Sequence, residues 1–463
     1  MKKYDLAVIG AGSGGLVAAL TAHRRGKKVA MIERNKIGGE CTHSGCVPSK
    51  TFISSARLFQ AIKTAGVHGL SEFADVNKLE FRKVMDHVNQ VIQGIYNTEK
   101  PEHFEQLGID VYLNQEGAKF LNPNEIQIGE ETIWAEFTVI ATGSSPRMAP
   151  HEGSELLNIL TNENFWDITE LPRSIVFLGG GVISAELGQS LARFGSQVTI
   201  IDRNPRILKA VDEEVGQLAT EILQHEGINI RTNAEVVLCQ QEPNEEIKIN
   251  LEENGQKTTM NAQTIFAALG RVPNIDGLQL GQAGVDYTAR GIQVNEFLQT
   301  SAPNIYACGD VASPAKFTHM ASYQAEICIE NILLGNHVKN DLSVLPWAIF
   351  MEPEIGHVGL SEADARRKYE EINVFRLPTE TVNRFTTESD TTGFIKIIMD
   401  EDDVILGADA IGAHAGEWIQ FFTLAITQKL SLEAIAETIF IYPTFSEIAK
   451  KVTSKYLRAK RFG

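Results

Sequence analysis

Residues 5–15 read Asp5-Leu6-Ala7-Val8-Ile9-Gly10-Ala11-Gly12-Ser13-Gly14-Gly15, a short apolar run that ends in a glycine-rich turn. An alanine-rich helix to about Arg25 and a second apolar strand over 28–33 are expected to follow. Strand, turn, helix and strand in this order predict a βαβ unit, and Gly10, Gly12 and Gly15 fit the G-x-G-x-x-G pattern of a dinucleotide-binding turn. Glu33 lies 23 residues after Gly10. An acid at the end of the second strand can accept hydrogen bonds from ribose hydroxyls.

The same arrangement recurs in the middle of the chain. A strand over 175–178 runs into Gly179-Gly180-Gly181, and a helix to about 194 and a strand over 197–201 follow. Ser184 stands at the third position of the pattern, and Asp202 again lies 23 residues after the first glycine. An acid at this place favours NADH over NADPH. Two basic residues, Arg203 and Arg206, come next and leave NADPH open. Two such turns predict two bound nucleotides and electron transfer between them.

Length and composition set the class of protein. A chain of 463 residues exceeds one hydrophobic core and predicts two to four domains. Hydrophobic residues at 43% and charged residues at 22% are typical of a folded soluble protein. A net charge of −17 opposes binding to nucleic acid. No apolar run approaches the roughly 20 residues that span a bilayer, so no membrane partner is expected.

The compartment follows from cysteine usage and from the N-terminus. Five cysteines are few and odd in number, which favours a reducing compartment. Lys2 and Lys3 before an apolar stretch resemble a signal peptide, but Asp5 and the four glycines that follow oppose that reading. The expected location is the cytoplasm.

The rest of the chain divides into a mixed region and a third segment. An amphipathic helix is expected over 81–106 and a β-rich stretch over 111–142, with a crossing between domains at Pro146 and Pro150. After about 346 the pattern changes to strands over 373–377 and 393–399, followed by helices. This segment has no glycine fingerprint and reads as a separate α+β domain.

The most informative stretch is Gly38-Gly39-Glu40-Cys41-Thr42-His43-Ser44-Gly45-Cys46-Val47-Pro48-Ser49-Lys50. Two cysteines five positions apart can close a small ring, and a thiol at a helix N-terminus has a lowered pKa. Lys50 lies four residues after Cys46 and shares its face if the segment is helical. A zinc site and two unrelated buried cysteines are the rival readings. Zinc would need a second ligand pair, whereas the remaining cysteines at 239, 308 and 328 are scattered.

Several motifs, taken in order, resemble the pyridine nucleotide-disulfide oxidoreductases, the flavoprotein family of lipoamide dehydrogenase and mercuric reductase. The motifs are the C-x4-C-V-P-S-K run after the first fingerprint, Ala141-Thr142-Gly143, Tyr306-Ala307-Cys308-Gly309-Asp310 and Pro353-Glu354-Ile355. The resemblance covers the whole chain. It implies an α/β fold with two Rossmann-like domains, one for FAD and one for NAD(P)H, and a C-terminal α+β dimerisation domain. The expected bounds are 1–150 with 275–340 for FAD, 151–274 for NAD(P)H and 341–463 for the interface.

The resemblance also implies roles for individual residues. Cys46 would face the flavin and form a charge-transfer complex, and Cys41 would exchange with the substrate. Lys50 would pair with Glu186 beside the flavin, and Asp310 would hold the ribityl chain. The helix beginning at Thr318-His319-Met320 would face the flavin pyrimidine edge. The positions that match the cofactor-binding motifs are Gly10, Gly12, Gly15, Glu33, Thr142, Gly143, Asp310, His319, Gly179, Gly181, Asp202 and Gly270.

One departure from the family concerns proton transfer. Disulfide reductases of this family carry a His-Pro near the C-terminus with a glutamate five residues after the histidine, and that histidine acts in the partner subunit of a homodimer. Here Tyr442 precedes Pro443, and Glu447 is retained. Tyrosine has a pKa near 10 and is a poor base at neutral pH. His43, inside the cysteine ring, is a candidate replacement base.

The expected function is therefore an FAD-dependent oxidoreductase of a homodimer. Electrons would pass from NADH through FAD and a redox-active Cys41–Cys46 disulfide to a disulfide acceptor, as in lipoamide dehydrogenase. Mercuric reductases resemble this chain in carrying a tyrosine at the position of Tyr442, but they end in a cysteine pair, whereas no cysteine follows Cys328. The alternatives are a metal-ion or quinone reductase, and the flavoprotein component of a larger complex. The acceptor could be a small molecule or carrier-bound.

Overall fold

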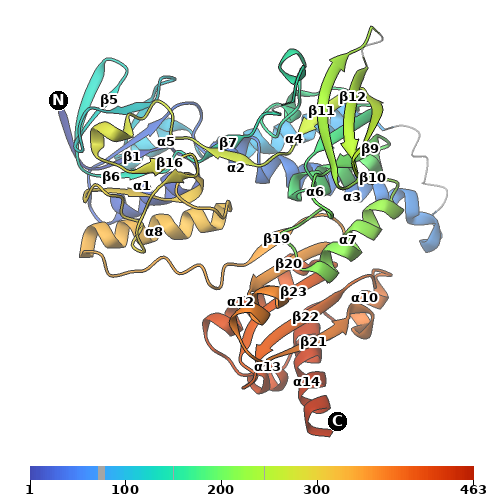
Figure 1. Ribbon diagram of the computed structural model, residues 1–463. Helices are drawn as coiled ribbons and strands as arrows, with labels where there is room; N and C mark the ends of the chain where they lie inside the picture. The colour runs from blue at the N-terminus through green and yellow to red at the C-terminus, as the bar shows by residue number, and fades with distance from the viewer. Residues whose placement is uncertain (71–78, 150, 244–245, 463) are drawn as a thin grey trace.

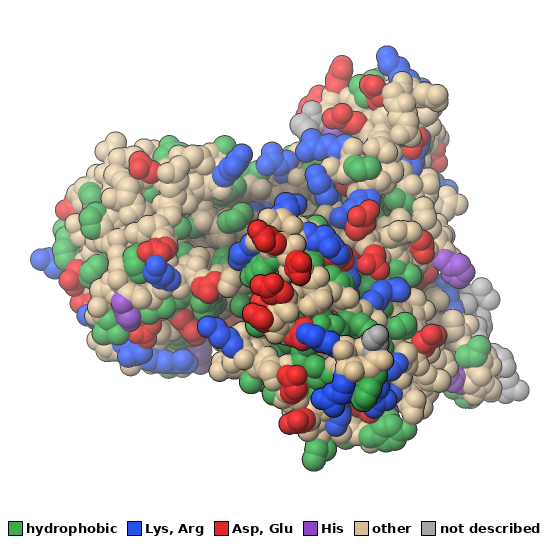
Figure 2. Space-filling view, turned by 60° about the horizontal axis from the view of Figure 1, so that its bottom comes forward, with side chains coloured by type: hydrophobic (Ala, Val, Ile, Leu, Met, Phe, Trp, Pro, Cys, Tyr) green, Lys and Arg blue, Asp and Glu red, His purple; other side chains and the backbone are tan. Residues whose placement is uncertain are grey.

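The computed structural model describes residues 1–70, 79–149, 151–243 and 246–462. They form three lobes, which Figure 1 shows as an N-terminal lobe, a middle lobe and a C-terminal lobe that ends in α14 (Glu447–Phe462). Figure 2 shows a hollow between the N-terminal lobe and the rest of the molecule. Within the described ranges, no helix has both the length and the apolar character needed to cross a bilayer.

The N-terminal lobe is built round the first glycine-rich turn. β1 (Lys2–Ile9) pairs in parallel with β2 (Val29–Glu33) on one side and with β6 (Glu131–Ile140) on the other. The strand order is β3-β2-β1-β6-β5-β4, with β18 also paired to β6. Central parallel strands are buried on both faces, which explains the continuous apolar run of β1. The other members are α1 (Ser13–Arg24), β3 (Asp110–Leu113), β4 (Ala118–Phe120), β5 (Glu125–Ile128), β18 (Ile305–Ala307) and α8 (Thr318–Leu334).

The middle lobe repeats the βαβ unit. Its parallel sheet has the order β10-β9-β8-β14, and a separate antiparallel sheet has the order β11-β12-β13. The helix α6 (Val182–Phe194) follows the second glycine turn, as the sequence predicts. The other elements are β8 (Ser174–Leu178), β9 (Gln197–Ile201), α7 (Glu213–His225), β10 (Asn229–Arg231), β11 (Ala234–Gln241), β12 (Ile247–Glu253), β13 (Gln256–Ala262) and β14 (Thr264–Ala267). The short strands β7 (Ser144–Pro146) and β15 (Arg271–Pro273) pair with each other.

The C-terminal lobe is a five-stranded antiparallel sheet with helices packed on it. Its strand order is β19-β20-β23-β22-β21. Trp418 and Phe422 are buried in its core together with Ile448 and Val452 of α14. The elements are β19 (Trp347–Ile349), β20 (Glu354–Gly359), α9 (Glu362–Lys368), β21 (Ile372–Pro378), α10 (Asn383–Thr387), β22 (Phe394–Asp400), β23 (Ile405–Gly412), α11 (Ala415–Trp418), α12 (Gln420–Thr427) and α13 (Leu432–Glu437).

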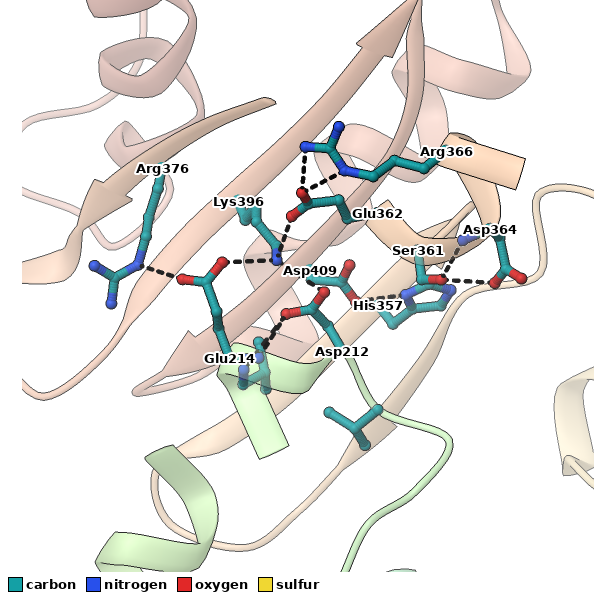
Figure 3. A network of polar contacts seen from close by, with 12 residues as sticks. Asp212, Glu214, His357, Ser361, Glu362, Asp364, Arg366, Arg376, Lys396 and Asp409 are labelled. Atoms are coloured by element: carbon teal, nitrogen blue, oxygen red, sulfur yellow. Dashed lines mark hydrogen bonds and ion pairs between the residues drawn. The ribbon is translucent and has the colours of Figure 1, made fainter. Parts of the chain in front are cut away.

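A buried lysine joins the middle and C-terminal lobes. Lys396 of β22 is 2% exposed, and its Nζ lies 2.8 Å from Asp212, 3.0 Å from Glu214 and 3.0 Å from Glu362 (Figure 3). Asp212 also caps the N-terminus of α7 by accepting a hydrogen bond from the Glu214 backbone N–H. Burial alone would lower the pKa of Lys396, but the three carboxylates outweigh it and raise the pKa. The charge cluster therefore ties α7 of the middle lobe to the C-terminal sheet.

Two sequence expectations differ from the structure. The helix expected over 81–106 is two helices, α4 (Phe81–Tyr96) and α5 (Pro101–Leu107). Proline lacks a backbone N–H and fits the first helical turn, so Pro101 starts a new helix instead of continuing the first. The C-terminal sheet has three strands besides the two that were expected. The middle of β23 is Gly407-Ala408-Asp409-Ala410, and its β-branched residues are confined to Ile405 and Ile411, so the sequence pattern of a strand is weak there.

Candidate active site

Two glycines of the first turn leave no space for a side chain. A Cβ atom on Gly10 would lie 2.4 Å from the carbonyl oxygen of Ala141, and one on Gly15 would lie 1.8 Å from the carbonyl oxygen of Gly10. The carboxylate of Glu33 accepts hydrogen bonds from the backbone N–H of Ala11 at 2.7 Å and of Asn35 at 2.8 Å. The turn, the start of α1 and the acid at the end of β2 are therefore fixed against one another.

A cavity of about 710 Å³ runs from this turn to the cysteine pair. Its lining includes Gly10, Gly12, Glu33, Thr142, Gly143, Asp310 and both cysteines. The helix α1 begins after Gly12 without a side-chain capping bond, so its first N–H groups are available to a pyrophosphate. The cavity, the carboxylate at its edge and the helix N-terminus fit FAD.

The second glycine turn repeats this geometry. A Cβ on Gly179 would lie 2.5 Å from the carbonyl oxygen of Ala268, which matches the contact of Gly10 with Ala141. The hydroxyl of Ser184 donates to the carbonyl of Gly179, so serine at the third position adds a bond where the first turn needs a glycine. Asp202 accepts hydrogen bonds from Gly180 N–H at 2.6 Å and from Asn204 N–H at 2.7 Å. These residues fit the adenosine half of a nicotinamide nucleotide.

The two cysteines lie on consecutive helices. Cys41 belongs to α2 (Gly39–His43), and Cys46 is the first residue of α3 (Cys46–Thr64). The carbonyl of Glu40 closes the ring by accepting from the backbone N–H of Ser44 at 2.8 Å and of Gly45 at 2.6 Å. Cys46 Sγ lies 3.3 Å from the hydroxyl oxygen of Thr318, the first residue of α8.

The surroundings of the two thiols separate their acidities. A hydrogen bond from Cys41 lowers the pKa of Cys46 to about 6, with further help from Thr318 and from the charge of Lys50, against the opposing effect of burial. The same hydrogen bond raises the pKa of Cys41, and burial raises it further. The reduced pair therefore carries one thiolate, on Cys46, and one protonated thiol, on Cys41.

This difference predicts a pH profile. In the reduced protein, alkylation of Cys46 by iodoacetamide should rise with a midpoint at about pH 6, because only the thiolate reacts. Cys41→Ala should move the midpoint to higher pH, because the hydrogen bond is the largest cause of the lowered pKa. Lys50→Met should move it in the same direction by less. Peptide mass spectrometry across pH checks this, and a wild-type midpoint at the usual thiol pKa of about 8.5 would contradict it.

An ion pair lies next to the cavity and joins α3 to α6. Lys50 Nζ of α3 lies 2.9 Å from Glu186 Oε2 of α6. The Glu186 side chain is 5% exposed, and its other oxygen accepts the backbone N–H of Phe350 at 2.8 Å. The structure thus brings together the lysine and the glutamate that the family resemblance assigned to one site.

A second charge cluster was not expected from the sequence. The carboxylate of Glu40, the residue before Cys41, forms an ion pair with Arg271 and accepts from Asn162 Nδ2 at 2.9 Å. Burial raises the pKa of Glu40 to about 7, against the opposing charge of Arg271. Arg271 also lies 3.6 Å from Asp310. The sequence signal for Glu40 is a charged residue inside a run of glycines and other small residues. The signal for Arg271 is its position directly after Gly270, a glycine with φ +90°.

The other expected site residues lie apart from the thiols. Tyr442 is 65% exposed, and its hydroxyl accepts from Asn383 Nδ2 at 3.0 Å. Glu447 accepts from the backbone N–H of Thr444 at 3.3 Å. Neither residue is part of the cavity lining, so within one protomer they do not reach the cysteine pair.

Two histidines are held by main-chain carbonyls. The ring of His43 lies on the cavity wall and is fixed by the carbonyl of Ile37 at 2.8 Å and by an edge contact with Tyr96. His319 bonds to the carbonyl of Pro346 at 2.8 Å. In the described part of the chain, no cluster of three or more His, Cys, Asp or Glu side chains is arranged to hold a metal ion.

Comparison with known proteins decides the family. The model of the pyridine nucleotide-disulphide oxidoreductase family matches residues 4–325, and the model of its dimerisation domain matches residues 345–453. The chain belongs to this family. The expectations of family, fold class and enzymatic nature are confirmed, and the chain is a flavoprotein disulfide reductase that uses FAD and NAD(P)H.

Individual relatives in this family carry the names of different activities. The chain is 31% identical to a mercuric reductase of Lysinibacillus sphaericus over 96% of this chain and 81% of that one. It is 32% identical to a dihydrolipoyl dehydrogenase of Bacillus subtilis (strain 168) over 96% of each chain. A solved structure of the HOCl-induced flavoprotein disulfide reductase RclA from Escherichia coli, as its Cu(II) complex, has a TM-score of 0.87 at 26% identity and covers 98% of this chain and 100% of that one.

Proposed function

We propose that this protein oxidises NADH and passes the two electrons through the Cys41–Cys46 pair to a thiophilic metal ion such as Cu(II) or Hg(II). FAD, when bound in the cavity, supplies the two-electron chemistry that links the nicotinamide to the cysteines. Glu33, Thr142, Gly143 and Asp310 would hold it together with the first glycine turn. The middle lobe would hold the nicotinamide nucleotide at its own glycine turn.

The observation that carries this proposal is the environment of Tyr442. A disulfide substrate needs a base to deprotonate the attacking thiol, and the pKa of Cys41 is raised. Tyr442 is an exposed phenol whose hydroxyl accepts a bond from Asn383, and a phenol is a poor base at neutral pH. A thiophilic metal ion removes this requirement, because a coordinating thiol loses its proton to the metal's own charge.

The electrons and protons balance for such an acceptor. The reduced pair holds one thiol on Cys41 and one thiolate on Cys46. Forming the disulfide releases two electrons and one proton. The two electrons reduce one Hg(II) to Hg(0) or two Cu(II) to two Cu(I), and the proton passes to solvent. The names of two relatives support this class of acceptor: one is a mercuric reductase, and the other was solved as a Cu(II) complex.

A disulfide such as lipoamide is the second candidate. It is favoured by the retained Glu447 and by the dihydrolipoyl dehydrogenases that match the chain over nearly its full length. In this case Tyr442 of a partner subunit or His43 would have to move the proton. Because the chain contains the family's dimerisation domain, we propose a homodimer, and light scattering at assay concentration tests it.

NADH is the proposed coenzyme. An acid at the position of Asp202 would accept hydrogen bonds from ribose hydroxyls and repel a 2′-phosphate. The guanidinium of Arg206 donates to the carbonyls of Leu208, Lys209 and Val211. Arg206 is therefore not free to bind a phosphate. Asp202→Asn should lower kcat/KM for NADH by roughly 10-fold to 100-fold, the effect of one charged hydrogen bond of about 1.5–3 kcal/mol. Arg206→Ala should not weaken NADPH use, and a selective loss of NADPH turnover in that variant would contradict the assignment.

The acceptor is tested by anaerobic NADH oxidation with Cu(II), Hg(II), lipoamide and a quinone in parallel. The proposal expects metal-ion turnover that is lost in Cys41→Ser and kept in the matched variant Cys239→Ala, whose thiol is buried in β11. Lipoamide turnover faster than metal turnover would favour the second candidate. Turnover of every acceptor that survives Cys41→Ser would overturn both.

A further inference from the structure

The ion pair of Lys50 and Glu186 has a third partner from the C-terminal lobe. Phe350 follows β19, and its ring centroid lies 4.4 Å from Lys50 Nζ. Its backbone N–H donates to Glu186 Oε1 at 2.8 Å, while Glu186 Oε2 lies 2.9 Å from the same Lys50 Nζ. One residue therefore contacts both members of the pair, with its ring on the lysine and its main chain on the glutamate.

The segment that carries Phe350 is fixed along one face of α6. Glu186, Gln189 and Arg193 are spaced by three and four residues, so they share a face of the helix. The side-chain amide of Gln189 accepts the backbone N–H of Glu352 at 2.7 Å and donates to its carbonyl at 2.6 Å. Arg193 forms an ion pair with the Glu352 carboxylate. Side chains of α6 thus hold residues 350–352 along the helix, and these bonds fix the position of the Phe350 N–H.

The same segment is also held from α3. Arg57 lies seven residues after Lys50, on the same face of that helix, and its Nε lies 2.9 Å from Glu352 Oε1. Phe52 of α3 packs edge-on against Phe194 of α6, with ring centroids 5.3 Å apart. The helices α3 and α6 and the segment after β19 therefore meet where Phe350 contacts Lys50.

We propose that Phe350 is a positioning residue for the Lys50–Glu186 pair, holding the ammonium group by its aromatic face and the carboxylate by its backbone N–H. The electron-rich face of the ring attracts the ammonium group, which restricts the long lysine side chain. Glu186 has one oxygen on Lys50 and the other on the Phe350 main chain, so its carboxylate has a single orientation. The C-terminal lobe in this way sets the geometry of a charge pair that is formed between α3 and α6. This inference rests on the proposed place of the pair beside FAD.

Three variants of the holoprotein test it. Phe350→Leu removes the ring and keeps the backbone donor, and Phe350→Tyr keeps the ring. The matched control is Phe59→Leu, which removes a ring lying 4.8 Å from Lys63 Nζ on the same helix. Two quantities are measured: the modification rate of Lys50 by acetic anhydride, followed by peptide mass spectrometry, and the anaerobic rate at which NADH bleaches the flavin absorbance.

Phe350→Leu should raise the labelling rate of Lys50 and slow flavin bleaching by about threefold to tenfold, with the NADH concentration for half-maximal rate unchanged. Phe350→Tyr should behave as the wild type, and Phe59→Leu should change neither quantity. Unchanged Lys50 labelling in Phe350→Leu, or equal effects in Phe350→Leu and Phe350→Tyr, would overturn the inference. Lys50 labelling does not depend on the thiols, so a failure of the proposed electron path would leave this readout intact.

Discussion

Gly15→Ala is expected to yield protein that lacks FAD. A Cβ at this position would lie 1.8 Å from the carbonyl oxygen of Gly10, which is backbone and has no rotamer that could move away. The turn must therefore open, and it is the turn that brings the N–H groups of α1 to the pyrophosphate. A backbone shift costing about 3 kcal/mol weakens FAD binding roughly 100-fold. The flavin content after purification and the Kd for FAD of the stripped protein measure this effect.

The control for this variant is Gly94→Ala. Gly94 lies inside α4 with nothing within 4 Å of an added Cβ and without a positive φ. Alanine there should stabilise the helix by about 0.5–1 kcal/mol and leave the flavin content unchanged. If Gly15→Ala bound FAD as tightly as Gly94→Ala does, the first glycine turn would not be the cofactor cradle.

Lys396→Met is expected to destabilise the protein by about 3–5 kcal/mol. The substitution keeps the length of the side chain but leaves Asp212, which is 5% exposed, without its cation. Asp212 also caps α7, so the loss affects the contact between the middle and C-terminal lobes as well as the helix (Figure 3). The denaturant midpoint and the melting temperature should both fall.

Lys460→Met is the control, because it removes a lysine from an ion pair that is exposed to solvent. Lys460 pairs with Asp403 at 2.6 Å, but its side chain is 53% exposed. A solvent-exposed pair contributes only about 0–1 kcal/mol, so this variant should melt close to the wild type. Equal melting temperatures for the two variants would show that the buried cluster does not hold the lobes together.

The parts of the site that depend on a local sequence pattern could be predicted from the sequence. The two glycine turns, the acids Glu33 and Asp202 and the placement of Cys46 at a helix N-terminus depend on spacing along the chain, and the structure has each of them. The pair of Lys50 and Glu186 is separated by 136 positions, and only the family resemblance predicted it.

Contacts between distant segments could not be read in this way. Phe350 is one phenylalanine among 22, and nothing in its neighbours marks it as a partner of Lys50. Arg271 and Glu40 meet because β15 pairs with β7 beside the cysteine loop, a register that no short pattern encodes. The prediction of a single helix over 81–106 was wrong for a different reason. The amphipathic pattern does not show the break at Pro101, where the second helix begins.

The proposed path of electrons from NADH through the Cys41–Cys46 pair can be tested by counting thiols. The oxidised holoprotein is mixed anaerobically with NADH and alkylated. The mass of the peptide that carries Cys41 and Cys46 is then measured by mass spectrometry. NADH should convert this peptide from a disulfide into a form with two alkylated cysteines, whereas Cys239, buried in β11, should stay unchanged. A Cys41–Cys46 disulfide that persists while NADH is consumed would contradict it.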